Sequence, residues 1–148
     1  MRKQAIKAFV LLGLFLSLSA IHVNAQNKTL IRKVEIPFDF SVRDKTFPAG
    51  AYSVTRVNQE KSILQLRSQD GQEIINIVTT TVQAKEAPKT ARLIFHRYGE
   101  TNFLAQIWES DDIQGRQLSK SRTERSVERD LAKRGEKPEI VDLAVSSP

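Results

Sequence analysis

Histidine and cysteine, the side chains most often used in catalytic and metal sites, are almost missing from this chain. The sequence holds two histidines, His22 and His96, and no cysteine. Thiolate catalysis, disulfides and cysteine-type metal sites are therefore excluded. His22 falls in a leader segment described below, which leaves His96 without a second histidine for a common zinc site. His96 lies in an alternating stretch, so we expect a half-exposed sheet residue.

Carboxylates are the next candidates for chemistry. Asp111 and Asp112 precede Gly115 and could bind calcium through oxygen, but the spaced aspartates of a calcium loop are missing, and a solvated turn is the expectation. A carboxylate pair for glycoside hydrolysis depends on the fold, and no pair stands in an apolar setting. Phosphate-binding glycine loops, G-x-S-x-G and H-E-x-x-H do not occur. We expect no catalytic residue, no metal and no cofactor.

An aromatic group at the last predicted hairpin is the more promising candidate for binding. Tyr98 and Trp108 flank this hairpin, with Arg97 and Gln106 close in sequence. Aromatic faces with polar neighbours could stack a sugar or another flat ligand. The competing interpretation is that both rings cover the core or the C-terminal helix.

A basic face on the C-terminal helix is the second candidate for binding. It is formed by Arg122, Arg125, Arg129 and Lys133. Such a face is typical of a docking element for an anionic partner, such as lipid headgroups, lipopolysaccharide or an acidic protein, or of a solvated amphipathic helix. The apolar stripe is narrow, since it consists of Val127 and Leu131 with Ala132 beside them, and this argues against membrane insertion.

The net charge argues against a general nucleic-acid binder. The formal charge is +6, but three of the 23 basic residues lie in the leader. The remaining chain has 20 basic and 17 acidic residues, and residues 116–139 alone hold 8 basic and 5 acidic residues. The rest of the chain is therefore neutral, and no specific nucleic-acid binding is expected.

The N-terminus has the pattern of a secretory signal peptide. A basic start (Arg2, Lys3, Lys7) and an apolar run over 8–20 precede Val23-Asn24-Ala25, which predicts cleavage before Gln26. The alternative is an uncleaved anchor, although the apolar run is short for a span. We expect no transmembrane helix after cleavage. Export without cysteine suits a bacterial periplasm or exterior.

The stretch 34–42 gives the clearest strand signal. Val34, Ile36, Phe38, Phe40 and Val42 alternate with polar residues and Pro37, which predicts a strand with one buried face. Because Pro37 cannot donate to a ladder, this strand is expected at an edge or a bulge.

Five further strands are expected after the first. They cover 52–56, 63–67, 73–83, 91–98 and 101–108, with a type I′ turn at Asp70-Gly71 and a type II′ turn at Gly99-Glu100. The strand at 73–83 is apolar on both faces, which favours a central or doubly covered position. In the strand at 101–108, Phe103, Ala105 and Ile107 are expected to share one face. Short links predict pairing in chain order.

The predicted fold is mainly β: a six- to seven-stranded antiparallel meander forming a small barrel or sandwich, plus a C-terminal helix. Residues 1–25 form the signal peptide, 26–118 the β domain, 119–135 the amphipathic helix, and 136–148 a tail. The tail is expected to dock weakly or add a seventh strand. Ser121 and Glu124 form a capping box at the start of the helix, and Gly135 ends it.

Three blocks of the chain resemble a family of small exported bacterial proteins common among soil bacteria such as Acidobacteria. The blocks are VEIPFDFSVRDKTFPAGAYSV (34–54), IFHRYGETNFLAQIW (94–108) and LSKSRTERSVERDLA (118–132). Typical members carry F-x-F-x-V-x-x-x-x-F-P-A-G-x-Y near the mature N-terminus. The resemblance implies a bacterial exported β-domain and brings no activity or binding residue with it.

Three functions follow from these observations. The first is an exported, non-enzymatic binding or interaction module of the bacterial envelope, with an envelope protein or an anionic surface as partner. The second is a structural envelope accessory that pairs through its sheet edges. The third and weakest is a small carboxylate-based hydrolase.

Overall fold

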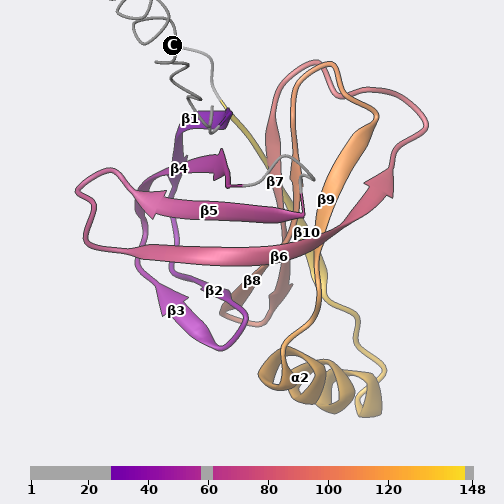
Figure 1. The fold of residues 1–148 in the computed structure, drawn as a ribbon. Coiled ribbons are helices and arrows are strands. Elements are labelled where there is room, and N and C mark those ends of the chain that lie inside the picture. The colour runs from indigo at the N-terminus through magenta and orange to yellow at the C-terminus, as the bar shows by residue number, and fades with distance from the viewer. Residues whose placement is uncertain (1–27, 58–61, 146–148) are drawn as a thin grey trace, which may run out of the picture.

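The computed structural model describes residues 28–57 and 62–145, and Figure 1 shows their arrangement. The predicted signal peptide at 1–25 and the predicted polar connection at 58–61 lie outside the described residues. Among the described residues, no helix has the length and apolar character needed to cross a membrane.

Strands make up most of the described chain. They are β1 (Thr29–Ile36), β2 (Phe40–Val42), β3 (Lys45–Phe47), β4 (Gly50–Arg56), β5 (Ile63–Ser68), β6 (Ile74–Gln83), β7 (Arg92–Tyr98), β8 (Thr101–Trp108), β9 (Gln114–Leu118) and β10 (Glu139–Ala144). Helix α2 (Arg122–Lys133) lies between β9 and β10. The prediction of a mainly β fold with a C-terminal helix is confirmed, with ten described strands in place of the six or seven expected.

These strands form one continuous sheet that does not close on itself. The order runs β1-β4-β5-β6-β9-β8, then from β8 to β7 and from β7 to β10, while the β2-β3 hairpin touches the first half of β8 through a parallel bridge at Ser41 and Phe103. In Figure 1, β1, β4, β5 and β6 lie across the molecule, and β7 to β10 stand upright beside them. Of the barrel and sandwich alternatives, a closed barrel is not formed.

Strand β6 joins the two halves. Its first part, Ile74–Val78, pairs with β5, and its second part, Thr79–Gln83, pairs with β9. The predicted pairing in chain order fails at one step: β6 pairs with β9 instead of β7, whereas the predicted pairing of β7 with β8 is confirmed. The expected central position of β6 is confirmed, since it lies between β5 and β9, but double coverage is wrong, because Ile74 and Val78 are 44% and 59% exposed on the outer face.

The main core lies between the two halves and draws on both. Ile36 and Tyr52 come from the first half, Phe40 from the β2-β3 hairpin, and Phe95 and Ile107 from the second half, all nearly inaccessible to solvent. The alternation predicted for 34–42 is confirmed as far as Phe40, with Phe38 half-buried against Phe95, but Ser41, expected on the polar face, is buried like Phe40 and Val42. The alternation is split between β1 and β2, because β1 ends at Ile36, directly before Pro37. As expected, β1 is an edge strand.

A bulge in β8 changes which of its side chains share a face. Ile94 pairs with Gln106 but Phe95 pairs with Leu104, which leaves Ala105 as an extra residue. Leu104 and Ile107 consequently both enter the main core, whereas Phe103 packs with Tyr98 and Leu131. The prediction that Phe103 and Ile107 share a face is therefore wrong.

Of the two predicted hairpin turns, one is confirmed and the other is wrong. Gly99 takes a positive φ of 62° between β7 and β8, as a II′ turn requires. At the β5-β6 hairpin, Gly71 has φ 74° but Asp70 does not have a positive φ. A bond from Gly71 N to Ser68 O and another from Ser68 N to Glu73 O enclose a four-residue loop, so the type I′ prediction is wrong.

The structure contains two strands that the sequence pattern missed and one that it left as an alternative. Strands β3 and β9 were not predicted at all, and β9 lies where the pattern was expected to break off. Strand β10 pairs with β7 from Glu139↔Arg97 to Ala144↔Arg92, so the tail alternative of a further strand holds, and weak docking is wrong.

Gly115 of β9 is required by space. A Cβ atom at Gly115 would lie 2.6 Å from ring atoms of Trp108, because the indole lies flat over this residue. The indole is also held by a hydrogen bond, because its Nε1 donates to Oε1 of Gln106 at 3.0 Å. Trp108 is therefore fixed between β8 and β9.

We predict that Gly115→Ala destabilises the protein by about 1–3 kcal/mol through overpacking. Because Trp108 is the only tryptophan, its fluorescence reports the displacement directly, together with chemical unfolding. Gln117→Ala, an exposed position of the same strand, is the control and should change stability by less than about 0.5 kcal/mol. An unchanged emission spectrum and midpoint in Gly115→Ala would contradict this packing.

Candidate binding site

A groove lies between the two ends of the sheet. Strands β1 and β10 each pair on one side only among the described strands. Between them lies a cavity of about 780 Å³, lined by residues of β1, by 89–91 and 110–111, and by 143–145. We call this feature the seam. Cavities of this size hold small ligands or short segments of chain.

The floor of the seam is apolar and continuous with the main core. Four half-buried hydrophobic residues both line the seam and pack against the core: Leu30, Ala91, Leu143 and Val145. A hydrogen bond from Val145 N to Ala91 O at 2.8 Å joins the segment 143–145 to the segment 89–91. The core is thus incompletely covered along this line.

Charged residues border the seam. Arg32 and Lys33 of β1 and Lys89 are exposed on its rim, as are Glu35 and Asp111. Lys33 pairs with Glu35 at 2.8 Å in solvent, an arrangement of small energetic value. The rim therefore carries one positive charge more than it carries negative charges.

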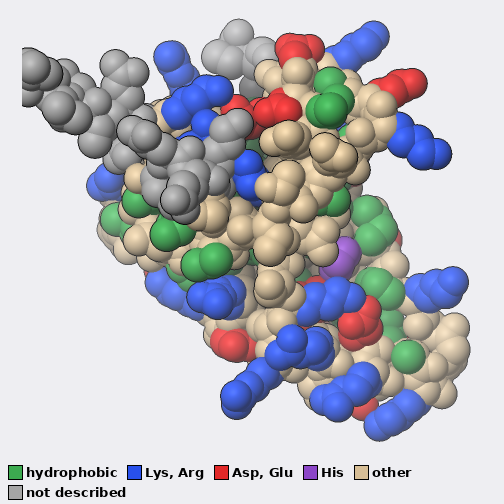
Figure 2. Space-filling model, turned by 45° about the vertical axis from the view of Figure 1, so that its right-hand side comes forward, with side chains coloured by type: hydrophobic (Ala, Val, Ile, Leu, Met, Phe, Trp, Pro, Cys, Tyr) green, Lys and Arg blue, Asp and Glu red, His purple; other side chains and the backbone are tan. Residues whose placement is uncertain are grey.

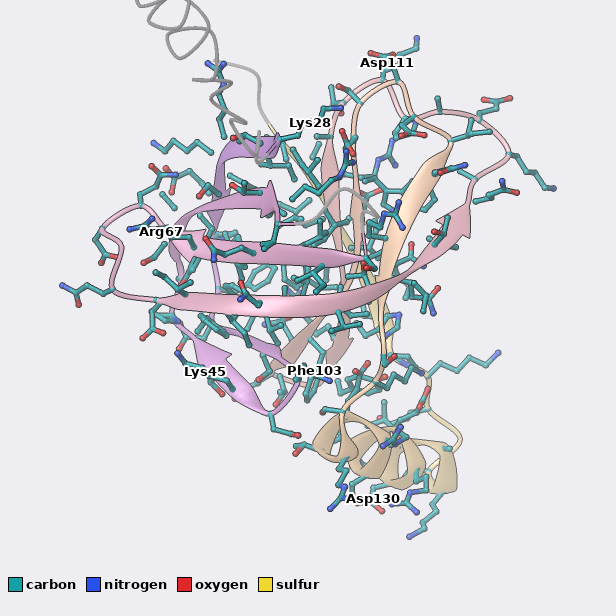
Figure 3. The ribbon with its side chains drawn as sticks, in the orientation of Figure 1. Lys28, Lys45, Arg67, Phe103, Asp111 and Asp130 are labelled. Atoms are coloured by element: carbon teal, nitrogen blue, oxygen red, sulfur yellow. The ribbon has the colours of Figure 1, made fainter. Side chains whose placement is uncertain are left out.

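An ion-pair network fixes the adjoining end of the molecule. The Glu109 carboxylate forms salt bridges with Arg56 at 2.6 Å and with Lys28 at 3.3 Å. The Arg116 guanidinium donates a hydrogen bond to the Thr81 hydroxyl at 2.7 Å. Burial lowers the pKa of the Arg116 guanidinium, and the nearby charge of Arg56 adds to this. Figure 3 places Lys28 and Asp111 at this end, far from Asp130 on α2.

The carboxylates at the seam do not form a hydrolytic pair. Glu35 and Asp111 line the same cavity, but both are exposed, whereas a general acid at neutral pH needs a buried setting. Asp112 accepts from Gln114 N at 2.8 Å, as in the solvated turn that was predicted. The described residues contain no cluster of three or more metal-ligating side chains.

The four residues predicted as a ligand site are separated by the structure. Trp108 and Gln106 lie together at a second cavity of about 570 Å³, next to Arg92 and Ile140. Tyr98 lies at the opposite end of the hairpin, 3% exposed beneath α2. Arg97 bonds Asn102 at 2.7 Å and lies over the Phe38 ring. Tyr98 and Arg97 therefore take no part in a surface shared with Trp108.

Glu124 attaches α2 to the sheet. Its backbone N–H donates to Ser121 Oγ at 3.1 Å, which is half of the predicted capping box. Its carboxylate does not return to Ser121 but bonds two β7 side chains, His96 Nδ1 at 2.9 Å and Tyr98 OH at 3.2 Å. His96 is thus the half-buried sheet residue expected, with a structural partner that the sequence did not indicate.

The residues predicted for docking lie on the exposed side of this helix. Arg122, Arg125, Arg129 and Lys133 are exposed, while Leu131 and half-buried Val127 pack on Tyr98 and Phe103. The helix ends at Lys133, and Gly135 follows with φ 75°, as predicted.

Sequence reasoning missed the seam. Val141, Leu143 and Val145 alternate with exposed Ile140, Asp142 and Ala144, a two-residue period that predicts a strand with one apolar face. That signal was present in the tail. The pairing of Glu124 with His96 had no such signal, since 28 residues separate them.

Comparisons of the chain with family models, curated proteins and solved structures found no match. The resemblance to small exported bacterial proteins therefore remains a prediction, and the function has to be argued from geometry.

We predict that Tyr98→Phe weakens the loss of stability at alkaline pH. Burial first, and then the charge of Glu124, raise the pKa of Tyr98. An unfolded tyrosine ionises near pH 10 while the folded one stays neutral, so stability is present below pH 10 and is lost as pH rises above it. The slope for one such proton approaches about 1.4 kcal/mol per pH unit.

Urea unfolding between pH 8 and 11.5 measures this slope. The only other tyrosine is Tyr52, whose pKa is also raised, mainly by burial. The variant Tyr52→Phe therefore measures how much of the loss of stability at alkaline pH comes from Tyr52. Equal slopes above pH 10 in the parent and in Tyr98→Phe would show that Tyr98 is not coupled to folding.

Proposed function

We propose that this protein is an exported, non-enzymatic binding module of the bacterial envelope, and that it takes an extended segment of another protein into the seam. The observation that carries the proposal is that β1 and β10 each have one edge without a partner among the described strands, on either side of an apolar cavity. Export is supported by the signal-peptide pattern of residues 1–25.

An extended segment would supply what the seam lacks. Its backbone would pair with the free edge of β1 or β10, which is the way that strand addition gives affinity. Alternate side chains would enter the cavity and cover Leu30 and Leu143. Completing the burial of a half-buried side chain of this size contributes roughly 1 kcal/mol.

The rim selects against self-association and favours an acidic segment. Register shifts interrupt β1 between Thr29 and Ile31 and between Ile31 and Val34, and bulges of this kind discourage edge-to-edge pairing of identical chains. Arg32 and Lys33 repel a second copy of the same edge and attract acidic residues. The partner we expect alternates apolar residues with acidic ones.

A second candidate is a small-molecule site at Trp108. The cavity there combines an indole, the Gln106 amide and the Arg92 guanidinium, groups that suit a flat polar ligand. However, one face of the indole is already covered by Gly115, and Arg92 bonds Asp142 at 2.8 Å. The seam has the larger volume of the two cavities and borders the free edges of β1 and β10, so we favour it.

The test is selection from a random peptide display library on the mature chain, residues 26–148. We predict peptides that alternate apolar and acidic residues, whose binding is measured by fluorescence polarisation. Leu143→Glu should abolish binding, because it places a charge in the seam, and the double variant Arg32→Glu, Lys33→Glu should weaken it at least tenfold. Ile74→Glu, an exposed apolar position away from the seam, is the control and should bind like the parent.

Two results would overturn the proposal. One is that no peptide is enriched, or that binding ignores both seam variants. The other is native mass spectrometry of protein from the periplasm that shows a bound mass of a few hundred daltons which Leu143→Glu loses, because the seam would then hold a small molecule.

A further inference from the structure

We propose that the outer face of α2 binds the phosphate groups of anionic lipid headgroups at a membrane surface. Arg122, Arg125, Arg129 and Lys133 are spaced by three, four and four residues, so they lie along one side of the helix. This stripe spans the whole helix. Figure 2 shows Lys and Arg side chains gathered at the lower end of the molecule, where Figure 1 places α2.

The charges of the stripe are largely free. Arg125 and Arg129 form no salt bridge with a described residue, and Arg129 Nε donates only to the Arg125 carbonyl, at 3.3 Å. Lys133 pairs with Asp130 at 3.2 Å, but both are exposed, and such a pair exchanges readily for another anion. The hydrogen bond from the Thr123 hydroxyl to Asp44, at 3.0 Å, is the main cause of the lowered pKa of Asp44, and the charge of Arg122 adds to it without a salt bridge.

The opposite face of α2 is already used. Leu131 and Val127 pack on Tyr98 and Phe103, and Glu124 is bonded to His96 and Tyr98. No apolar face is left for insertion into the hydrocarbon region. The helix can therefore contact a membrane only through its charges, and this contact is peripheral and salt-sensitive.

Three observations favour phosphate lipids over other anions. Three of the four cations are arginines, whose planar fork binds phosphate through two hydrogen bonds. Helix α2 lies at one end of the molecule (Figure 1), and all four residues of the stripe are exposed, so the stripe can meet a flat surface along its length. Outside residues 116–139 the mature chain is neutral, so it lacks the broad positive field of a nucleic-acid binder.

The experiment is co-sedimentation of the mature chain with vesicles of 30% phosphatidylglycerol in phosphatidylcholine, at 50 mM salt. We expect binding to these vesicles, weak binding to pure phosphatidylcholine, and loss of binding at 500 mM salt. Each charge contributes about fivefold to partitioning, so Arg122→Gln, Arg125→Gln, Arg129→Gln should lower binding by about 100-fold. The corresponding triple lysine variant should stay within about tenfold of the parent.

The control removes three charges elsewhere. Lys28→Gln, Arg67→Gln, Lys85→Gln has the same net charge as the arginine variant, uses exposed positions outside the seam and away from α2, and should bind within about threefold of the parent. Equal loss in both glutamine variants would overturn the proposal, because binding would then follow net charge alone. Tight binding to heparin or to an acidic protein without binding to the vesicles would also overturn it and would assign the stripe to a polyanion.

Discussion

One strand determines the shape of this protein. Strand β6 pairs with β5 along its first half and with β9 along its second, so a single backbone belongs to both halves of the sheet. The halves are thereby folded over one core, with Tyr52 and Phe95 meeting the same cluster of side chains. Because the sheet is joined at β6 and not at its ends, β1 and β10 each keep one edge, on either side of the seam, that no other described strand pairs with. The proposed binding surface is a consequence of this pairing.

A buried carboxylate provides the second constraint. Glu124 connects the first turn of α2 to His96 and Tyr98 of β7, and β10 follows the helix onto the free side of β7. The helix therefore has a fixed orientation, with its basic side outward. Asp111, which lines the seam, and Asp130 on α2 lie at opposite ends in Figure 3. A molecule held at a membrane through α2 would keep its seam turned away from that surface, open to a protein partner.

Local signals in the sequence were sufficient for much of the fold. The alternation from Val34 to Phe40, the Gly99 turn and the Ser121 cap each depend on residues close in sequence, and all are confirmed. Strand β9, with the sequence QGRQL, has little apolar pattern because its role is to admit the Trp108 ring over Gly115. Its pairing with β6 places Thr79 opposite Leu118. These two residues are too far apart in the sequence for a local pattern to predict their pairing.

The candidate site was harder to predict than the fold. Phe103 and Ile107 were assigned to one face by strict alternation, and the bulge at Ala105 places them on different faces. The Glu124 carboxylate was assigned to its own helix end, but two partners on β7 bind it instead. The seam depends on which edges stay unpaired, and this is a property of the whole sheet. Only the basic stripe of α2 is placed as its spacing predicted, because helix periodicity is local.

Amide hydrogen exchange by NMR tests the central claim most directly. In the free protein, amides of β4, β6 and β8 should exchange slowly, whereas outward amides of β1 and β10 should exchange quickly. A bound alternating peptide should slow the exchange of the amides on the seam side of β1 or β10. The exchange rates of the β6 amides should stay unchanged. If those seam amides are already protected in the free protein, or if the peptide protects another edge, the open seam is not the binding site.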